Sequence, residues 1–257
     1  MMSKQFPIFS NRFEAVDALR GLAMVWMTAF HFSFDLNHFG FWSQDFYRDI
    51  FWTGQRTLIL SLFLFCAGLG QAIALAQGQS WSRFGRRWAQ IAACALLVSA
   101  GSWLMYPQSF IYFGVLHGIA LMLIVVRLTA HWGAWLWVAG ALAVAIKFIY
   151  VYAIETPATS HFVEILNAPL LNWLGLVTRN PVTEDYVPLL PWLGVMWWGV
   201  AAGSWLTRQR PLLLTRPLPA LLKPLVGLGR WSLIYYMLHQ PVLIGALMTV
   251  SWLMKSG

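Results

Sequence analysis

Ionisable residues inside apolar stretches are the first candidates for chemistry, because a charge in lipid is costly. Residues 12–35 combine charged groups, a long apolar run, a histidine and an aspartate. Asp17 and Arg20 are three residues apart, so on a helix they can pair on one face. His31 lies about 16 Å further along on roughly the same face, and Asp35 follows it at i+4. Asp35 either orients His31 as a base, or both are ordinary polar residues at a helix end.

Three other places in the apolar part of the chain carry polar groups. His117 lies within Phe113–Gly118, where glycines allow close helix approach, so it lines a polar site or makes an interhelical hydrogen bond. Tyr235 and His239 share a face at i and i+4, just before a proline, which is typical of a cavity lining or of a packing kink. Arg56 begins an apolar stretch and either snorkels to the headgroups or holds an anion bidentately.

Motifs for metals and nucleotides are missing from the sequence. It has no His-x3-His or Cys-x2-Cys pair, and its two cysteines lie in apolar segments. It also lacks a Walker or Rossmann glycine pattern and a nucleophile elbow. We therefore expect no metal site, and we expect the cysteines to serve in packing.

The composition indicates which kind of secondary structure positions these residues. The chain has 257 residues, of which 59% are hydrophobic and 10% charged, against about 25% charged in soluble domains. A soluble fold of this size could not hide so much apolar surface. The sixteen tryptophans fit the membrane–water interface. We predict an all-α, polytopic transmembrane helix bundle that forms one membrane-embedded domain over residues 1–257.

Seven segments are long and apolar enough to span a membrane, which needs about 20 residues. Two ambiguous stretches widen the count to between six and eight. Phe162–Val177 contains several polar residues and is predicted to be re-entrant or interfacial, and Leu218–Leu228 is short, broken by proline and glycine, and predicted to lie along the membrane surface. The seven segments are Ala18–Phe34, Leu58–Leu75, Trp88–Met105, Phe110–Val126, Trp132–Tyr152, Val187–Leu206 and Trp231–Leu253.

The basic residues predict the orientation. With seven spans and a cytoplasmic N-terminus, twelve of the seventeen basic residues fall on the inside, as the positive-inside rule requires. The basic residues that give the net charge of +8 lie in short loops between apolar segments, where they set the topology, so a nucleic-acid partner is not expected. The twelve are Lys4, Arg12, Arg20, Arg83, Arg86, Arg87, Arg127, Arg208, Arg210, Arg216, Lys223 and Arg230.

Four stretches of the chain resemble a known family. They are Arg12 with 17–23 (DALRGLA) and His31, then 113–117 (FGVLH), 185–194 (DYVPLLPWLG), and 229–241 (GRWSLIYYMLHQP). The first resembles the opening motif of the transmembrane acyltransferase superfamily. Together they resemble bacterial proteins of the heparan-α-glucosaminide N-acetyltransferase catalytic-domain family, over nearly the whole chain.

The resemblance implies an acyltransferase that moves an acyl group, usually acetyl, from cytoplasmic acetyl-CoA to a sugar hydroxyl or amine across the membrane. It implies a catalytic histidine near the outer end of the bundle. His31 matches the histidine of the superfamily, while the histidine of the lysosomal relative lies in the first outer loop, where this chain has His38. Asp35 would orient His31, and His239 or Tyr235 would stabilise the oxyanion; direct transfer and an acetyl-histidine intermediate both stay open.

Arginines near the cytoplasmic mouth would bind the phosphates of coenzyme A, although most basic residues there serve the positive-inside rule. The candidate donor-binding residues are Asp17, Arg20, Arg56, Arg87 and His117; the candidate catalytic residues are His31, Asp35, His38, Tyr235 and His239.

Two other classes of protein compete with an enzyme. A small-molecule transporter or exporter would show repeats or paired broken helices, which the sequence lacks. A non-enzymatic scaffold subunit would use its polar residues as interhelical contacts. The expected partners are an acyl-CoA donor, a carbohydrate or glycan acceptor and membrane lipids, with homo-oligomerisation left open. The expected location is a bacterial inner membrane.

Overall fold

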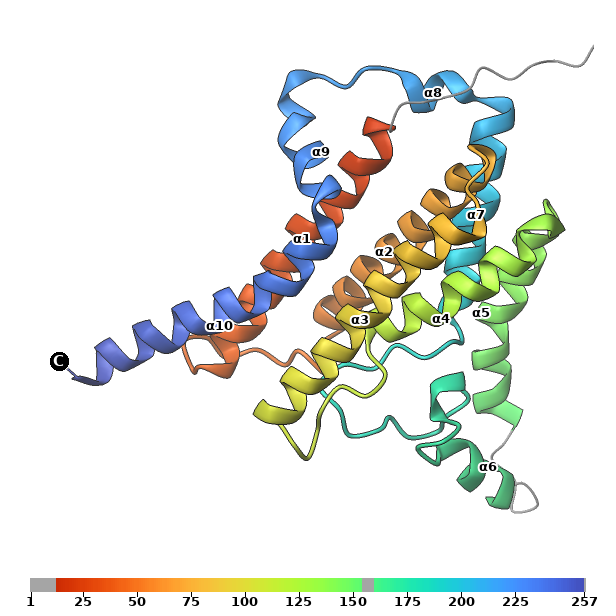
Figure 1. Cartoon of the computed structure of the whole chain (residues 1–257). Helices are drawn as coiled ribbons and strands as arrows, with labels where there is room; N and C mark the ends of the chain where they lie inside the picture. The colour runs from red at the N-terminus through yellow and green to blue at the C-terminus, as the bar shows by residue number, and fades with distance from the viewer. Residues whose placement is uncertain (1–12, 154–159, 257) are drawn as a thin grey trace, which may run out of the picture.

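The computed structural model describes residues 13–153 and 160–256, and every regular element in these ranges is helical (Figure 1). The prediction of an all-α bundle is therefore confirmed for them; Lys4 and Arg12 lie outside the described residues. Single turns of 3-10 helix occur at Ala130–Trp132, Asn172–Leu174 and Ala220–Leu222. The helices are α1 (Glu14–His38), α2 (Ile50–Ala76), α3 (Trp81–Met105), α4 (Val115–Thr129), α5 (Trp135–Ala153), α6 (Ser160–Asn167), α7 (Trp192–Gln209), α8 (Pro211–Thr215), α9 (Lys223–Arg230) and α10 (Ser232–Ser256).

Four helical segments of the described chain are long and apolar enough to cross a membrane. They are α2, α3, Val115–Trp132 and Ser232–Lys255, and Trp135–Tyr150 in α5 is a shorter apolar helix. The chain is thus an integral membrane protein. A helix occupies each of the seven predicted segments. Length and composition identify four candidate spans among the described residues, so the count of seven and the cytoplasmic N-terminus stay predictions.

Several helices depart from the expected limits: α2 and α3 begin earlier than predicted, at Ile50 and Trp81, and α7 begins later, at Trp192. Two further departures concern the loops. The predicted helix at Phe110 begins only at Val115, because residues 106–114 form a loop that is joined to the loop before α7. There the Val187 N–H donates to the Phe113 carbonyl oxygen at 3.1 Å. The ambiguous stretch at Phe162 forms the eight-residue helix α6 and then turns. Since eight residues extend only about 12 Å, α6 does not span a bilayer by itself.

The stretch predicted to lie along the membrane surface, Leu218–Leu228, leads into α9, which packs against α1; its position relative to the membrane stays a prediction. The backbones of α9 and α1 approach so closely that a Cβ at Gly21 would overlap the Leu225 carbonyl oxygen, and one at Gly229 would overlap that of Asp17. Lys223 also donates to both carboxylate oxygens of Glu14 at 2.7 Å. Gly229, which suggested a broken segment, is thus a position that allows this contact, whereas a Cβ at Gly227 would have no neighbouring atom within 4 Å, so Gly227 takes no part in it.

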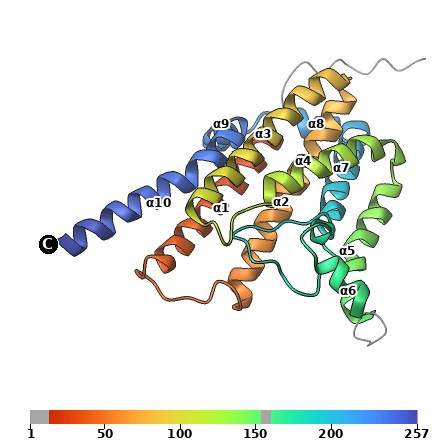
Figure 2. The same ribbon diagram turned by 60° about the horizontal axis from the view of Figure 1, so that its bottom comes forward.

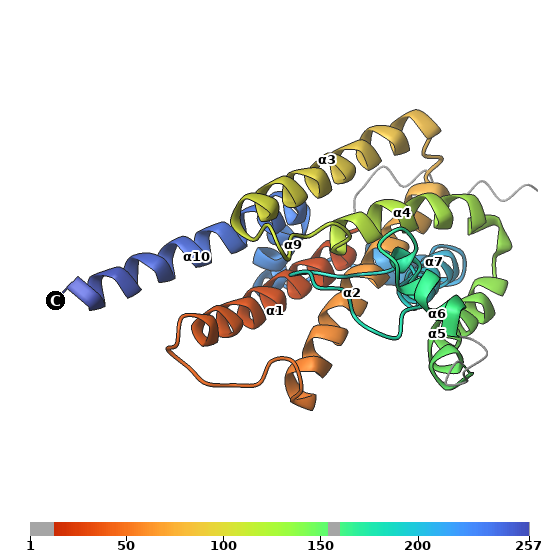
Figure 3. The same cartoon turned by 90° about the horizontal axis from the view of Figure 1, so that it is seen from below.

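The helices form two groups on opposite sides, with a pair of helices between them. Figures 1 and 2 show α1, α9 and α10 together on one side and α5 on the other, and in Figure 3 α2 and α7 lie between them. The C-terminal part of α10 runs out from the bundle in all three views. We call the end where α1 begins, at Asp17 and Arg20, the arginine end. The end where α1 finishes, near His31, is the histidine end.

The pairing of α2 with α7 depends on glycines. A Cβ at Gly68 would overlap the Met196 carbonyl oxygen, and one at Gly199 would overlap that of Phe65. The main hydrophobic core, which includes Leu64, lies beside this contact. Small residues allow such close backbone approach, and the resulting dispersion contacts hold helices together in lipid, where the hydrophobic effect between helices is absent.

Gly199→Ala is expected to destabilise the protein by about 1–3 kcal/mol, because the new methyl group must push α7 away from α2. Thermal unfolding of the purified protein in detergent measures this effect. Gly54→Ala is the matched control: it lies in α2, where a Cβ would have no neighbouring atom within 4 Å, and it should leave the unfolding temperature unchanged or raise it. Equal unfolding temperatures for the two variants would contradict the close-packing argument.

Candidate active site

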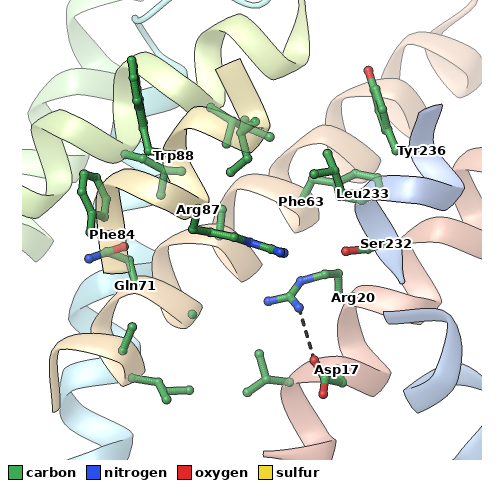
Figure 4. Close-up of a pocket in the computed structure, with 18 of the residues that line it drawn as sticks. Asp17, Arg20, Phe63, Gln71, Phe84, Arg87, Trp88, Ser232, Leu233 and Tyr236 are labelled. Atoms are coloured by element: carbon green, nitrogen blue, oxygen red, sulfur yellow. Dashed lines mark hydrogen bonds and ion pairs between the residues drawn. The ribbon is translucent and has the colours of Figure 1, made fainter. Parts of the chain in front are cut away.

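A cavity of about 530 Å³ lies between α1, α2, α3, α4 and α10. Arg20 and Arg87 line it from α1 and α3, and their side chains extend toward each other in Figure 4. Val115 lines it from the start of α4, and Ser232 and Tyr236 line it from α10. The cavity therefore extends from the arginine end into the bundle.

Asp17 organises the charges at the arginine end. Its side chain is buried, Arg20 Nη1 donates to its Oδ1 at 3.2 Å, and Arg230 Nε lies 3.7 Å from its Oδ2. The predicted pairing of Asp17 with Arg20 at i and i+3 is thus present. Because Asp17 fixes Arg20 from one side, the guanidinium group is pre-oriented and part of its fork remains directed toward the cavity.

Gln71 is a polar residue of the cavity that the sequence interpretation missed. It lines the cavity from α2, is only 7% exposed, and its Nε2 has no hydrogen-bond partner among the described residues. A buried amide donor without a partner costs about 1–3 kcal/mol, so its retention points to a ligand group that accepts from it. The available signal was a lone amide within the apolar segment Leu58–Leu75.

Two histidines that are far apart in sequence meet at the histidine end. The ring centroids of His31 and His239 are 5.2 Å apart. His239 Nδ1 lies 2.7 Å from the Tyr236 carbonyl oxygen, to which it must donate, so in neutral His239 the lone pair is on Nε2. This Nε2 is buried and has no partner among the described residues. Neutral His239 therefore presents an acceptor, which fits a base and does not fit the predicted oxyanion donor.

Asp35 has a different partner from the one that helix periodicity predicted. Gln240 Nε2 donates to its two carboxylate oxygens at 2.9 and 3.1 Å, and in the described chain no hydrogen bond links Asp35 to His31. Asp35 is buried, so its charge needs this amide donor. It joins α1 to α10.

The Tyr235 hydroxyl is also committed to a contact between α1 and α10. It lies 2.6 Å from Thr28 Oγ1, and Thr28 itself donates to the Met24 carbonyl oxygen at 2.8 Å. The Tyr235 proton must then point to Thr28, which leaves no proton for an oxyanion. The Tyr235 ring stacks on His239 with an interplanar angle of 9°, so Tyr235 orients that imidazole.

Three other predicted residues lie apart from the cavity. His38 is exposed at the end of α1, and Arg56 is exposed near the start of α2. His117 Nδ1 accepts from the Gly114 N–H at 3.3 Å, and its Nε2 lies 3.1 Å from Ser99 Oγ. His117 is thus the interhelical contact that the sequence offered as its alternative role. None of the three lines the cavity, and neither do His31, Asp35, Tyr235 and His239, so Asp17, Arg20 and Arg87 are the predicted residues that line it.

Asp185, in the loop before α7, was quoted in the resemblance but not chosen as a site residue. Its Oδ2 accepts from the Val115 N–H at 2.7 Å, so it caps the start of α4 next to the cavity. Burial raises the pKa of its carboxyl, against the opposing effects of the Val115 N–H and of Arg56. Tyr236, also missed, lies within electrostatic range of this carboxylate.

These features define a class of protein: an integral membrane protein with a polar site enclosed by its own helices. The family model described as heparan-alpha-glucosaminide N-acetyltransferase, catalytic, matches residues 12–241, and the chain belongs to this family. The match includes every candidate site residue and confirms the resemblance seen in the sequence. It places the chain in a family of membrane acetyltransferases. No curated protein and no solved structure matches the chain.

Proposed function

We propose that this protein is a membrane-bound acyltransferase that moves an acyl group, most simply acetyl, from cytoplasmic acyl-CoA to a sugar or glycan acceptor on the opposite side. The observation that carries the proposal is the cavity at the arginine end, in a chain of this family. Two guanidinium groups and an unpartnered amide face into it. The arginine end would then be cytoplasmic, in a bacterial inner membrane.

The cavity residues fit the chemistry of acetyl-CoA. Guanidinium groups bind phosphate oxygens bidentately, and Arg20 and Arg87 approach from opposite walls. The Gln71 amide suits a carbonyl or phosphate oxygen of the donor. Asp17 would position Arg20 and bind no phosphate itself, because a carboxylate repels it.

The histidine end supplies the proton acceptor. As the acceptor oxygen or nitrogen attacks the thioester carbonyl carbon, its proton passes to a neutral imidazole, and the C–S bond then breaks. The proton finally reaches the departing thiolate, which leaves as free coenzyme A. His239 and His31 are the two candidates, and the buried lone pair of His239 makes it the better oriented base. An acetyl-histidine route uses the same pair.

Acetyl-CoA at saturating concentration is expected to raise the unfolding temperature, since a ligand that binds only the folded state stabilises it. Arg87→Ala should weaken acetyl-CoA binding at least about tenfold, because it removes a charge-assisted contact. Thermal shift titrations in detergent measure both effects. Arg86→Ala is the matched control, since Arg86 is an exposed neighbour that does not line the cavity.

The competing outcomes are distinct. If wild-type protein shows no stabilisation by acetyl-CoA and releases no coenzyme A thiol with an amino-sugar acceptor, the proposal is wrong. Uptake of a solute into proteoliposomes without thiol release would favour the transporter. If Arg87→Ala and Arg86→Ala lose the same amount of acetyl-CoA affinity, Arg87 is not a specific part of the donor site, and the loss reflects only the reduced positive charge.

A further inference from the structure

Tyr236 stands where the cavity meets the histidine end. It lines the cavity from α10, and Figure 4 shows its hydroxyl turned away from Asp17 and Arg20. Its ring centroid lies 5.6 Å from that of His239. Tyr236 therefore occupies the position between the arginines that would hold the donor and the imidazole that would accept a proton.

The residues of α10 that line this path lie on one face of the helix. Ser232, Tyr236 and His239 follow one another at i, i+4 and i+7, which repeats on one side of a helix. The first two line the cavity. A donor anchored at Arg20 and extended along this face would bring its thioester past Ser232 to Tyr236 before it reached His239.

The Tyr236 hydroxyl is a free hydrogen-bond donor. Among the described residues nothing accepts its proton, whereas the neighbouring Tyr235 hydroxyl is committed to Thr28 at 2.6 Å. An ordinary phenol has a pKa of about 10 and keeps its proton at neutral pH. Arg20, Arg87, Gln71 and Ser232 also carry donors in the cavity, but Tyr236 is the cavity residue whose ring contacts His239. Neutral His239 itself presents a lone pair.

We propose that Tyr236 is a catalytic residue that donates its O–H to the thioester carbonyl oxygen and stabilises the oxyanion that forms when the acceptor attacks. This inference rests on the proposed acyl transfer and adds the group that stabilises the developing negative charge. The phenol keeps its proton throughout: the carbonyl oxygen gains charge as the new bond forms and loses it as the C–S bond breaks. Donors placed at a developing oxyanion act on the transition state more than on the bound substrate.

The test compares Tyr236→Phe with the wild-type protein, using acetyl-CoA and methyl α-glucosaminide as the offered acceptor. Removal of one oxyanion donor should lower kcat by about a hundredfold, with the acetyl-CoA dissociation constant changed by less than about threefold. The unfolding temperature without ligand should be unchanged, because the lost hydroxyl makes no bond within the described part of the protein. Thiol release measures turnover, and thermal shift titration measures binding.

Tyr47→Phe is the matched control, because it removes the same oxygen from a tyrosine that is 69% exposed outside the cavity. Turnover of Tyr236→Phe at the wild-type rate would overturn this inference and leave the acyltransferase proposal intact. A variant that loses stability or donor affinity while keeping kcat would show a structural role, which also overturns it. Wild-type protein that neither binds nor cleaves acetyl-CoA would overturn the proposed function first, and this inference with it.

Discussion

His239→Ala is expected to lower acyl transfer by about 10²- to 10⁴-fold, the usual contribution of a general base. The reason is the fixed direction of its ring: Nδ1 donates to the Tyr236 carbonyl, stacking by Tyr235 holds the plane, and Nε2 is left as a buried lone pair. Acetyl-CoA should still stabilise the variant, because the arginines and Gln71 are unchanged. Initial rates of thiol release, with binding followed by thermal shift, separate the two properties.

His131→Ala is the control for this experiment. His131 has the same local arrangement, with Nδ1 2.7 Å from the carbonyl oxygen three residues earlier, but it is exposed and its ring contacts Trp132 instead of the cavity residue Tyr236. His31→Ala should be measured beside it. A His239→Ala variant with normal turnover, together with an inactive His31→Ala, would assign the base to His31 and refute the argument from the His239 ring direction.

Gln71→Leu is expected to have two opposite effects. The apo protein should become more stable by up to about 1–3 kcal/mol, because the substitution removes a buried donor that has no partner among the described residues. Binding of acetyl-CoA should weaken by about tenfold, because the ligand loses the group that satisfies this donor. Unfolding temperatures measured without ligand and across an acetyl-CoA titration report both quantities from one set of samples.

Higher stability of the apo protein together with weaker acetyl-CoA binding would identify Gln71 as a binding residue. Gln90→Leu, at an exposed glutamine on α3, should leave the acetyl-CoA affinity unchanged. If Gln71→Leu lowers the unfolding temperature of the apo protein and binds acetyl-CoA normally, then its amide has a structural partner and the site argument for Gln71 is wrong.

Local features of the site were predictable from the sequence, and long-range ones were not. The pairing of Asp17 with Arg20 follows from a spacing of three residues within one helix. The same rule suggested Asp35 as the partner of His31, but the actual partner, Gln240, lies 205 positions away and no periodicity reports it. The contact between His31 and His239 is equally invisible to spacing, although the family resemblance supplied both residues.

In the fold, too, local features were predictable from the sequence and long-range contacts were not. Hydropathy located the helices because burial in lipid selects apolar runs, and each predicted segment contains one. It placed the start of α4 near Phe110 instead of Val115, since that end is determined by hydrogen bonds from the loop before α7. The contact of α9 with α1 was not predicted for a related reason: Gly229 looks like a helix breaker until the backbone of α1 is known to lie against it.

The bonds between α1 and its neighbours also determine how the bundle can deform. Lys223, Tyr235 and Gln240 fasten α9 and α10 to α1 at three heights, so these helices form one stiff wall of the cavity. The glycine contact of α2 with α7 makes a second stiff wall. Between α3 and α10, which both line the cavity, the packing is sparse. A ligand that reached from Arg87 on α3 to Tyr236 on α10 would bridge this seam between the two helices, and we expect it to hold them together.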